Sequence, residues 1–280
     1  MKLPLTLLLF VLAASGRTEG VDAQKSGVPA MSPYTEKSEQ QFAFYPGGKL
    51  EIAAAAPGSY TIIGWPKAEM RVEMEKVFYY ISPGQARELA ARYPTHVTRT
   101  QTTARITTAG ARKPEAAMEI NFRVYVPAER TDLNVKMIKG DLSLTGWSGA
   151  VEATVEEGSI DISGMAGYVS VLTKHGGLKV ELSGKRWPGY GLIAATRMGP
   201  VDVAIPIDYG AALQLQTKDG KITLDYPPQI IEGESVPLQV LAKNKSQTVS
   251  APIGGSGTRI RIMTAVGDML VKGVNPIQKD

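Results

Sequence analysis

A segment that repeats every 18 residues is the feature of this sequence that most restricts its fold. Gly140-Asp-Leu-Ser-Leu-Thr-Gly146 returns as Gly158-Ser-Ile-Asp-Ile-Ser-Gly164 and again as Gly176-Gly-Leu-Lys-Val180. A second segment, Gly149-Ala-Val-Glu-Ala-Thr-Val155, returns 18 residues later as Gly167-Tyr-Val-Ser-Val-Leu-Thr173. A fixed period with alternating apolar residues is typical of stacked β-repeats, in which each period supplies one supersecondary unit.

Two sets of aliphatic residues occupy equivalent positions in the three copies: Leu142, Ile160 and Leu178, and, two residues further on, Leu144, Ile162 and Val180. Alternate side chains of a strand lie on opposite faces, so both sets point to the same side. Stacked about 4.8 Å apart, they would form two continuous aliphatic columns. The sequence therefore predicts an all-β protein, a single β-solenoid similar to a parallel β-helix or β-roll.

The repeat continues with insertions. Gly199-Pro-Val-Asp-Val-Ala-Ile205 begins 23 residues after Gly176, and Gly220-Lys-Ile-Thr-Leu224 begins 21 residues after Gly199. A threonine stands three residues before each of four of these glycines: Thr173, Thr196, Thr217 and Thr264 before Gly176, Gly199, Gly220 and Gly267. We expect the solenoid to span residues 131–273, followed by a tail at 274–280.

The N-terminus has the pattern of a secretory signal peptide. Lys2 precedes an apolar run from Leu3 to Ala14, which is too short to span a bilayer as a stable helix. Cleavage after Gly16 and cleavage before Gln24 both fit, and we assign residues 1–23 to the signal peptide. We therefore expect an exported protein, periplasmic or at the cell surface, without a transmembrane segment in the mature chain.

Between the signal peptide and the repeats we expect two regions. Residues 24–43 are polar without apolar periodicity, which indicates a flexible leader. Residues 44–130 read as an N-terminal β region with one helix at 83–93, since Ser82 suits the N-cap, Pro83 the first helical position and Pro94 the end. We expect this region to cap the open edges of the solenoid.

Composition excludes several function classes. The formal net charge is +4, and the basic residues are scattered among acidic ones, which indicates solubility and no nucleic-acid partner. The chain has no cysteine, which excludes disulfides, thiolate metal sites, cysteine nucleophiles and lipoprotein attachment. His96 and His175 are far apart in sequence, and we expect His175 to be an exposed turn residue. No catalytic residue, cofactor or metal site is predicted.

Charged residues also occupy the position between the two aliphatic columns, where stacked carboxylates could form a metal or catalytic site. The predicted outward column reads Ser143, Asp161, Lys179, Asp202 and Thr223. Lys179 separates the two carboxylates, and a divalent-cation site needs converging carboxylates without an ammonium between them. The column is better interpreted as a stabilising ladder of alternating charge.

The insertion Lys185-Arg-Trp-Pro-Gly-Tyr-Gly191 is the candidate contact with a partner, through Arg186, Trp187 and Tyr190. Loops on a rigid scaffold commonly carry binding, and exposed Trp, Tyr and Arg dominate interfaces. The alternative is that Trp187 folds back over a corner of the repeat, as large aromatic residues are usually well buried.

The run from Phe122 to Gly146 resembles the bacterial putative adhesin family. An apolar strand ending in Val126-Pro-Ala128, a short Asp132-Leu133 strand and then Gly140-Asp141 carry the resemblance, which covers roughly residues 48–273. It implies a β-solenoid, an envelope location and no catalytic motif. The departures are the Lys185–Gly191 insertion and the excursion between Tyr226 and Gly257, which leave the number of coils open.

The sequence therefore favours an exported, non-enzymatic, adhesin-like β-solenoid that serves as a scaffold or binding module of the cell envelope, with a protein or glycan partner. Two alternatives stay open. One is a carbohydrate-active β-helix enzyme, which would show outward Asp and Glu clustered on one face. The other is a periplasmic sensor or regulatory partner, which would need a membrane-linked neighbour.

Overall fold

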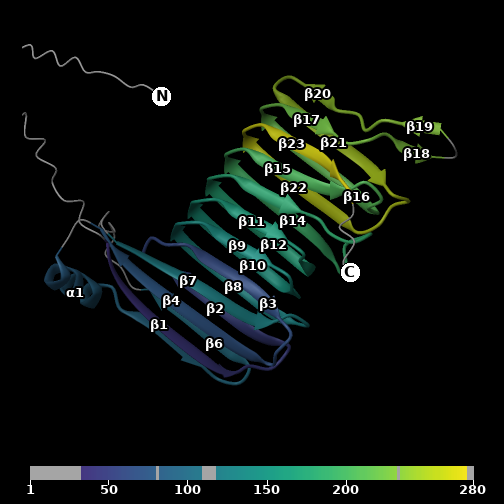
Figure 1. Ribbon diagram of the computed structural model, residues 1–280. Helices are drawn as coiled ribbons and strands as arrows, with labels where there is room; N and C mark the ends of the chain where they lie inside the picture. Colours follow the sequence, from purple (N-terminus) through teal and green to yellow (C-terminus); the bar gives the residue numbers. More distant parts are fainter. Residues whose placement is uncertain (1–32, 80–81, 109–117, 232–233, 276–280) are drawn as a thin grey trace, which may run out of the picture. The chain divides into compact units, whose positions relative to one another are not determined.

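The computed structural model describes residues 33–79, 82–108, 118–231 and 234–275, and this part of the chain is nearly all β with one short helix, as predicted (Figure 1). The expected signal peptide, residues 1–23, lies outside the described residues. The elements are β1 (Tyr34–Ala43), β2 (Gly48–Ala54), β3 (Tyr60–Trp65), β4 (Glu69–Phe78), α1 (Pro83–Arg92), β5 (Thr95–Arg99), β6 (Thr103–Thr108), β7 (Met118–Pro127), β8 (Thr131–Lys139), β9 (Leu142–Thr145), β10 (Ser148–Glu157), β11 (Ile160–Ser163), β12 (Ala166–His175), β13 (Leu178–Glu181), β14 (Gly191–Met198), β15 (Val201–Pro206), β16 (Ala211–Asp219), β17 (Ile222–Asp225), β18 (Gln229–Ile231), β19 (Glu234–Val236), β20 (Leu241–Lys243), β21 (Ser246–Ile253), β22 (Arg259–Val266) and β23 (Met269–Val274).

Two large sheets hold most of these strands. The ten-stranded sheet has the order β1-β4-β7-β3-β9-β11-β13-β15-β23-β17, and the eleven-stranded sheet has the order β20-β21-β16-β22-β14-β12-β10-β8-β2-β6-β5. The buried apolar side chains of both sheets form one core cluster. β18 and β19 form a separate two-stranded sheet.

The inner strands of both sheets are parallel and come from repeat units. We define a repeat unit as one strand of the eleven-stranded sheet followed directly by one strand of the ten-stranded sheet, for example β10–β11. Ile160 in β11 pairs with both Leu142 in β9 and Leu178 in β13, and all three are buried. Each unit thus adds aliphatic side chains to the same buried columns.

The corner between the two strands of a unit is a tight backbone contact. Gly158 has a φ of 143°, and a Cβ there would lie 2.0 Å from the carbonyl oxygen of Gly140 in the neighbouring unit. Thr173 is buried, and its Oγ1 donates a hydrogen bond of 2.6 Å to the Gly158 carbonyl oxygen. The threonine that precedes a corner glycine therefore binds the corner of the unit next to its own.

Chain order and spatial order differ at both ends of the stack. The unit β2–β3 lies between β6–β7 and β8–β9, and the unit β22–β23 lies between β14–β15 and β16–β17 (Figure 1). The expected outward column is therefore wrong at one point: Leu270 stands between Asp202 and Thr223. The physical reason is that β23, from the end of the chain, pairs with both β15 and β17.

The structure also corrects part of the expected flexible leader at 24–43, of which residues 24–32 lie outside the described residues. Residues 34–43 form strand β1, which pairs antiparallel with β4 over its whole length. Most side chains of β1 are polar and exposed, so no apolar alternation marks it in the sequence. Its backbone pairing with β4 holds it in place, together with the packing of Tyr34 and the buried Phe42 near its two ends.

The N-terminal region 44–130 is not separate from the repeats, because its strands β2, β3, β6 and β7 belong to the two large sheets. The helix forms at the expected place. Ser82 caps α1 through a capping box, in which the Ser82 Oγ accepts from the Gln85 N–H and the Gln85 side chain accepts from the Ser82 N–H. Ala86 and Leu89 on its inner side are buried.

Antiparallel strands form three of the four ends of the large sheets. β4 and β1 extend the ten-stranded sheet beyond β7, β5 pairs with β6, and β21 and β20 follow β16. At the fourth end β17 pairs with β23 alone among the described strands. A side chain partly covers this edge, because the Ile222 N–H donates to Gln247 Oε1 at 2.7 Å.

Candidate functional site

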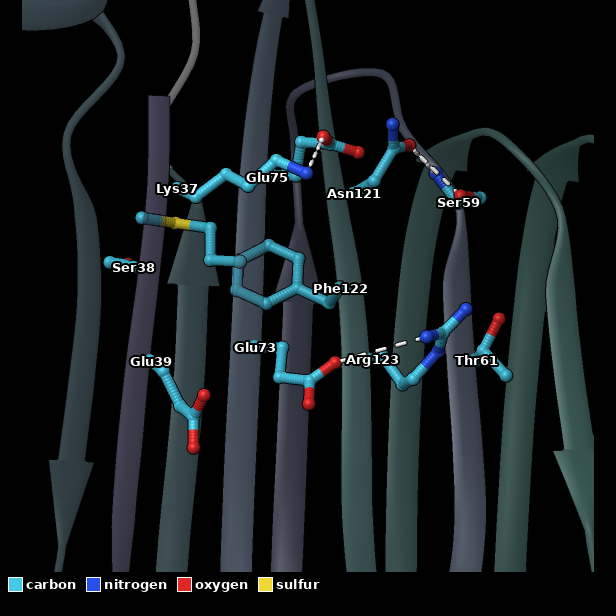
Figure 2. Close-up of a pocket in the computed structure, with 11 residues that line it drawn as sticks. Lys37, Ser38, Glu39, Ser59, Thr61, Glu73, Glu75, Asn121, Phe122 and Arg123 are labelled. Atoms are coloured by element: carbon cyan, nitrogen blue, oxygen red, sulfur yellow. Dashed lines mark hydrogen bonds and ion pairs between the residues drawn. The ribbon is translucent and has the colours of Figure 1, made fainter. Parts of the chain in front are cut away.

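A groove of about 510 Å³ lies over β1, β4, β7 and the start of β3, and it is the candidate site (Figure 2). Its lining residues are Lys37, Ser38, Glu39, Ser59, Thr61, Glu73, Met74, Glu75, Asn121, Phe122 and Arg123. Most of these are polar or charged, and they come from four strands, and from Ser59 just before β3, that only the sheet brings together.

The antiparallel register places the charged side chains of the groove side by side. Lys37 in β1 faces Glu75 in β4, and Glu39 faces Glu73. Glu73 in turn faces Arg123 in β7. Since alternate residues point to opposite faces, these side chains share the outer face of the sheet, while neighbours such as Val72 and Val124 are buried beneath it.

Ion pairs connect these side chains across the strands. Lys37 Nζ lies 3.1 Å from Glu75 Oε1, and Arg123 Nη1 lies 3.9 Å from Glu73 Oε2 (Figure 2). Arg71, next to the groove, pairs with both neighbouring carboxylates: its Nε is 3.0 Å from Glu39 Oε1, and its guanidinium also binds Glu73. One guanidinium thus holds together two like charges that face each other across β1 and β4.

Uncharged polar groups form the opposite side of the groove. The N–H and the hydroxyl of Ser59 donate hydrogen bonds of 2.8 and 2.9 Å to Asn121 Oδ1 (Figure 2). The amide NH₂ of Asn121 and the hydroxyl of Thr61 remain on the same face. This side therefore offers donors and acceptors without net charge.

Aromatic rings adjoin the groove at the other end of the same strands. The rings of Trp65 and Tyr125 lie 5.3 Å apart, and the guanidinium of Arg71 lies 5.4 Å from the Tyr125 ring. The Trp65 indole N–H donates to the Glu69 carbonyl oxygen at 2.7 Å, which fixes the orientation of the ring. Both aromatic side chains are half-buried, so they offer apolar surface beside the charged network.

The structure separates the three residues predicted as a partner contact. Trp187 is only 4% exposed, and its indole N–H donates to the Gly167 carbonyl oxygen at 2.9 Å. It packs at a corner of the stack, so it has little surface to offer a partner. Arg186 is exposed, and Tyr190 is 89% exposed. None of the three lines the groove.

The two histidines and the outer charged column do not converge on a site among the residues that the structure describes. His96 and His175 are both exposed. Lys179 Nζ binds Glu181 on its own strand at 2.7 Å. Partial burial raises the pKa of Asp161; Lys179 acts against this, while Asp141 and Glu181 act with it. Within the described ranges, no group of three or more His, Asp or Glu side chains could hold a metal ion.

Sequence reasoning missed the groove. A signal is present in β4, where Arg71, Glu73 and Glu75 alternate with apolar residues. It predicts a charged outer face but does not indicate which strands lie beside it.

Comparison with known proteins gives distant likenesses in fold. No family model and no curated protein matches the chain. A solved structure described as a putative cell adhesion protein from Clostridium sporogenes is similar with a TM-score of 0.44 and 13% identity, covering 85% of this chain and 100% of that one. A putative adhesin from Bacteroides fragilis (TM-score 0.29, 9% identity) covers 85% and 97%, and a putative lipid binding protein from Parabacteroides distasonis (0.26, 10%) covers 84% and 97%. No helix long and apolar enough to cross a membrane occurs in the part of the chain that the structure describes.

Proposed function

We propose that this chain is an exported, non-enzymatic binding module of the cell envelope, a β-solenoid whose groove over β1, β4, β7 and β3 binds a neutral glycan. The observation that carries the proposal is the groove itself: a polar surface of fixed geometry on a stack of paired strands. The solenoid interpretation rests on the repeat units, which pair in parallel with a constant step of 18 residues from β8–β9 to β12–β13.

The charge of the groove favours an uncharged polar ligand. Three carboxylates and two cations line it, and the Arg71 guanidinium beside it adds a third cation. Ion pairs connect opposite charges here, so neither a polyanion nor a polycation would meet a field of one sign. Asn121, Ser59 and Thr61 supply the hydrogen-bonding groups that recognise hydroxyls, and Trp65 and Tyr125 supply apolar ring surface.

The same groove argues for binding without catalysis. A glycoside hydrolase of the common type needs two carboxyl groups, one of which donates a proton to the leaving group. Glu39 and Glu73 are the paired carboxylates of this groove, and both bind the Arg71 guanidinium. Such shared pairing is typical of a structural ion-pair network. The carbohydrate-active enzyme therefore stays the alternative that the experiment must exclude.

The first test uses the purified full-length chain and a panel of immobilised neutral polysaccharides and bacterial cell-wall glycans. The proposal expects retention on at least one of them, without new reducing ends after long incubation with that glycan. Release of reducing ends would contradict the proposal and would support the carbohydrate-active enzyme instead. If the chain binds none of the glycans but binds a protein of the cell envelope, the ligand is a protein and the glycan proposal is wrong.

Location is tested separately on intact cells. Added protease should reach the protein in whole cells or after the outer envelope is permeabilised, and its N-terminus should begin after residue 16 or residue 23. A cytoplasmic protein that still begins at Met1 would contradict export.

A further inference from the structure

Strand β1 ends the ten-stranded sheet, and its sequence is complementary to itself. Among the described strands β1 pairs only with β4, so one side of its backbone has no strand beside it. We propose that two copies of this chain join through β1 in an antiparallel pair centred on Ser38, which connects the two ten-stranded sheets and their grooves.

Backbone direction supports pairing at this edge. Phe44 continues the register of β1 on β4, and its N–H donates to the Ala68 carbonyl oxygen at 3.1 Å. Backbone groups of a strand alternate in direction, so even-numbered residues of β1 face β4 and odd-numbered residues face the free edge. In the proposed pair these odd-numbered residues, Thr35, Lys37, Glu39 and Gln41, would exchange about eight hydrogen bonds with the second copy.

Charge complementarity selects the register. With Ser38 opposite Ser38 of the second copy, Lys37 of each copy faces Glu39 of the other on the outer face. A shift of the centre by one residue would place Lys37 opposite Lys37, or Glu39 opposite Glu39, and like charges directly opposite each other are destabilising. Pairing centred between two residues would mix the two faces of the sheet.

The proposed pair also relieves a like-charge contact that one copy has within itself. Glu39 faces Glu73 across β1 and β4, and Arg71 is the cation that binds both. The second copy would place its Lys37 on the other side of Glu39. The row across the joined sheets would then read Arg123, Glu73 and Glu39 of one copy followed by Lys37 and Glu75 of the other, so a cation would stand on each side of the two like charges. Lys37 would also complete the open side of the neighbouring groove.

The inner face of β1 is complementary in the same register. Tyr34 would face Phe42 of the second copy at both ends of the pair, and Glu36 would face Gln40. Tyr34 already lies against Phe78 at 6.0 Å between ring centroids, and Phe42 is buried beneath the Arg99 guanidinium. Cross-strand aromatic pairs stabilise strand pairing, so these pairs would stabilise the dimer on the inner face as the ion pairs do on the outer face.

A cysteine scan of β1 tests the register. The chain has no cysteine, so a single introduced thiol can only bond to its copy in another chain. Ser38 would face itself in a non-hydrogen-bonded pair with about 4.5 Å between Cα atoms, which a disulfide can span. We expect Ser38→Cys to form a covalent dimer under mild oxidation. Gln40→Cys is the matched control: both side chains are exposed, but the two Gln40 positions would lie about 14 Å apart and should not cross-link.

A second pair of variants separates the backbone contact from the charge. Lys37→Pro removes an edge N–H that β4 does not use, whereas Lys37→Ala removes only the charge. Sedimentation of the full-length chain over a concentration series should show a wild-type dimer, a weakened Lys37→Ala dimer and a Lys37→Pro monomer with unchanged circular dichroism. A monomeric wild type, or equal cross-linking of Ser38→Cys and Gln40→Cys, would overturn the proposal.

Discussion

Thr217 Oγ1 donates a hydrogen bond of 3.0 Å to the carbonyl oxygen of Gly267, a residue that follows it by 50 positions in the chain. Three other buried threonines bind corner glycines in the same way: Thr173 to Gly158 at 2.6 Å, Thr196 to Gly176 at 2.9 Å and Thr264 to Gly199 at 3.3 Å. Each bond connects a unit to the next one in space. The Thr217 bond therefore shows that the last unit of the chain, β22–β23, lies directly beside the unit β16–β17.

Thr173→Val tests the contribution of this bond. Valine keeps the shape of the buried side chain but removes the donor to the Gly158 carbonyl oxygen, so we expect a loss of about 1 kcal/mol in the free energy of unfolding. Thr154→Val is the control, because Thr154 lies on the outer face of the neighbouring strand β10. Urea denaturation measures both variants, and equal stability of the two would contradict a role for the threonine bond.

Gly158→Ala tests the close contact at the corner. The new Cβ would lie 2.0 Å from the Gly140 carbonyl oxygen and φ is 143°, so we expect a loss of about 3 kcal/mol or more. Gly184 also has a positive φ, 73°, but nothing lies within 4 Å of its Cβ position. Gly184→Ala should therefore lower the free energy of unfolding by only about 1–2 kcal/mol, because alanine disfavours a positive φ. Thermal unfolding compares the two variants. A larger loss of stability for Gly184→Ala than for Gly158→Ala would contradict the close contact at the Gly158 corner.

Trp187→Ala and Tyr190→Ala separate packing from contact in the insertion. Because Trp187 is buried, Trp187→Ala should lower the free energy of unfolding by about 3–5 kcal/mol. Tyr190 is exposed, so Tyr190→Ala should change it by less than about 0.5 kcal/mol. Both are measured by chemical denaturation. A Trp187→Ala variant as stable as wild type would show that the indole does not belong to the core, and would restore it as a candidate for partner contact.

Asp161→Asn tests the charge of the outer column. Burial raises the pKa of Asp161 in the folded chain above its unfolded value, so the ionised carboxylate lowers stability at neutral pH. This loss disappears as the pH falls below the unfolded value of about 3.9. We expect the variant to have a higher Tm than wild type at about pH 7 and a difference that shrinks towards about pH 3. A variant with a lower Tm at neutral pH would mean that attraction to Lys179 outweighs burial.

The sequence predicts the central part of this fold because contact partners there are one period apart. Val151 pairs with Val169, and Leu142 with Ile160, each 18 residues on. The interposed units have no such signal: β22 pairs with both β14 and β16, and its apolar alternation fits any neighbour of the stack equally well. The place of the last unit, between β14–β15 and β16–β17, is therefore seen only in the structure.

The groove was beyond sequence reasoning for a related reason. Lys37, Glu73 and Arg123 are far apart in the chain, and only the antiparallel register of β1, β4 and β7 brings them together. Strand β1 is polar at most positions and reads as a leader, because an edge strand gains its stability from backbone pairing. The position of Trp187 was also undecided by the sequence, because an aromatic residue in a polar insertion can pack at a corner or face a partner. The structure shows that it is buried.

The most direct test of the account is the affinity of groove variants for the glycan that the full-length chain retains. Asn121→Ala combined with Arg123→Ala removes a hydrogen-bonding side chain and a cation from the groove; Lys179→Ala removes an exposed cation from the same sheet face outside it. Isothermal titration should show the double variant at least about tenfold weaker, a loss of about 1.4 kcal/mol, with Lys179→Ala unchanged. Equal affinity of all three proteins would contradict the groove as the binding surface.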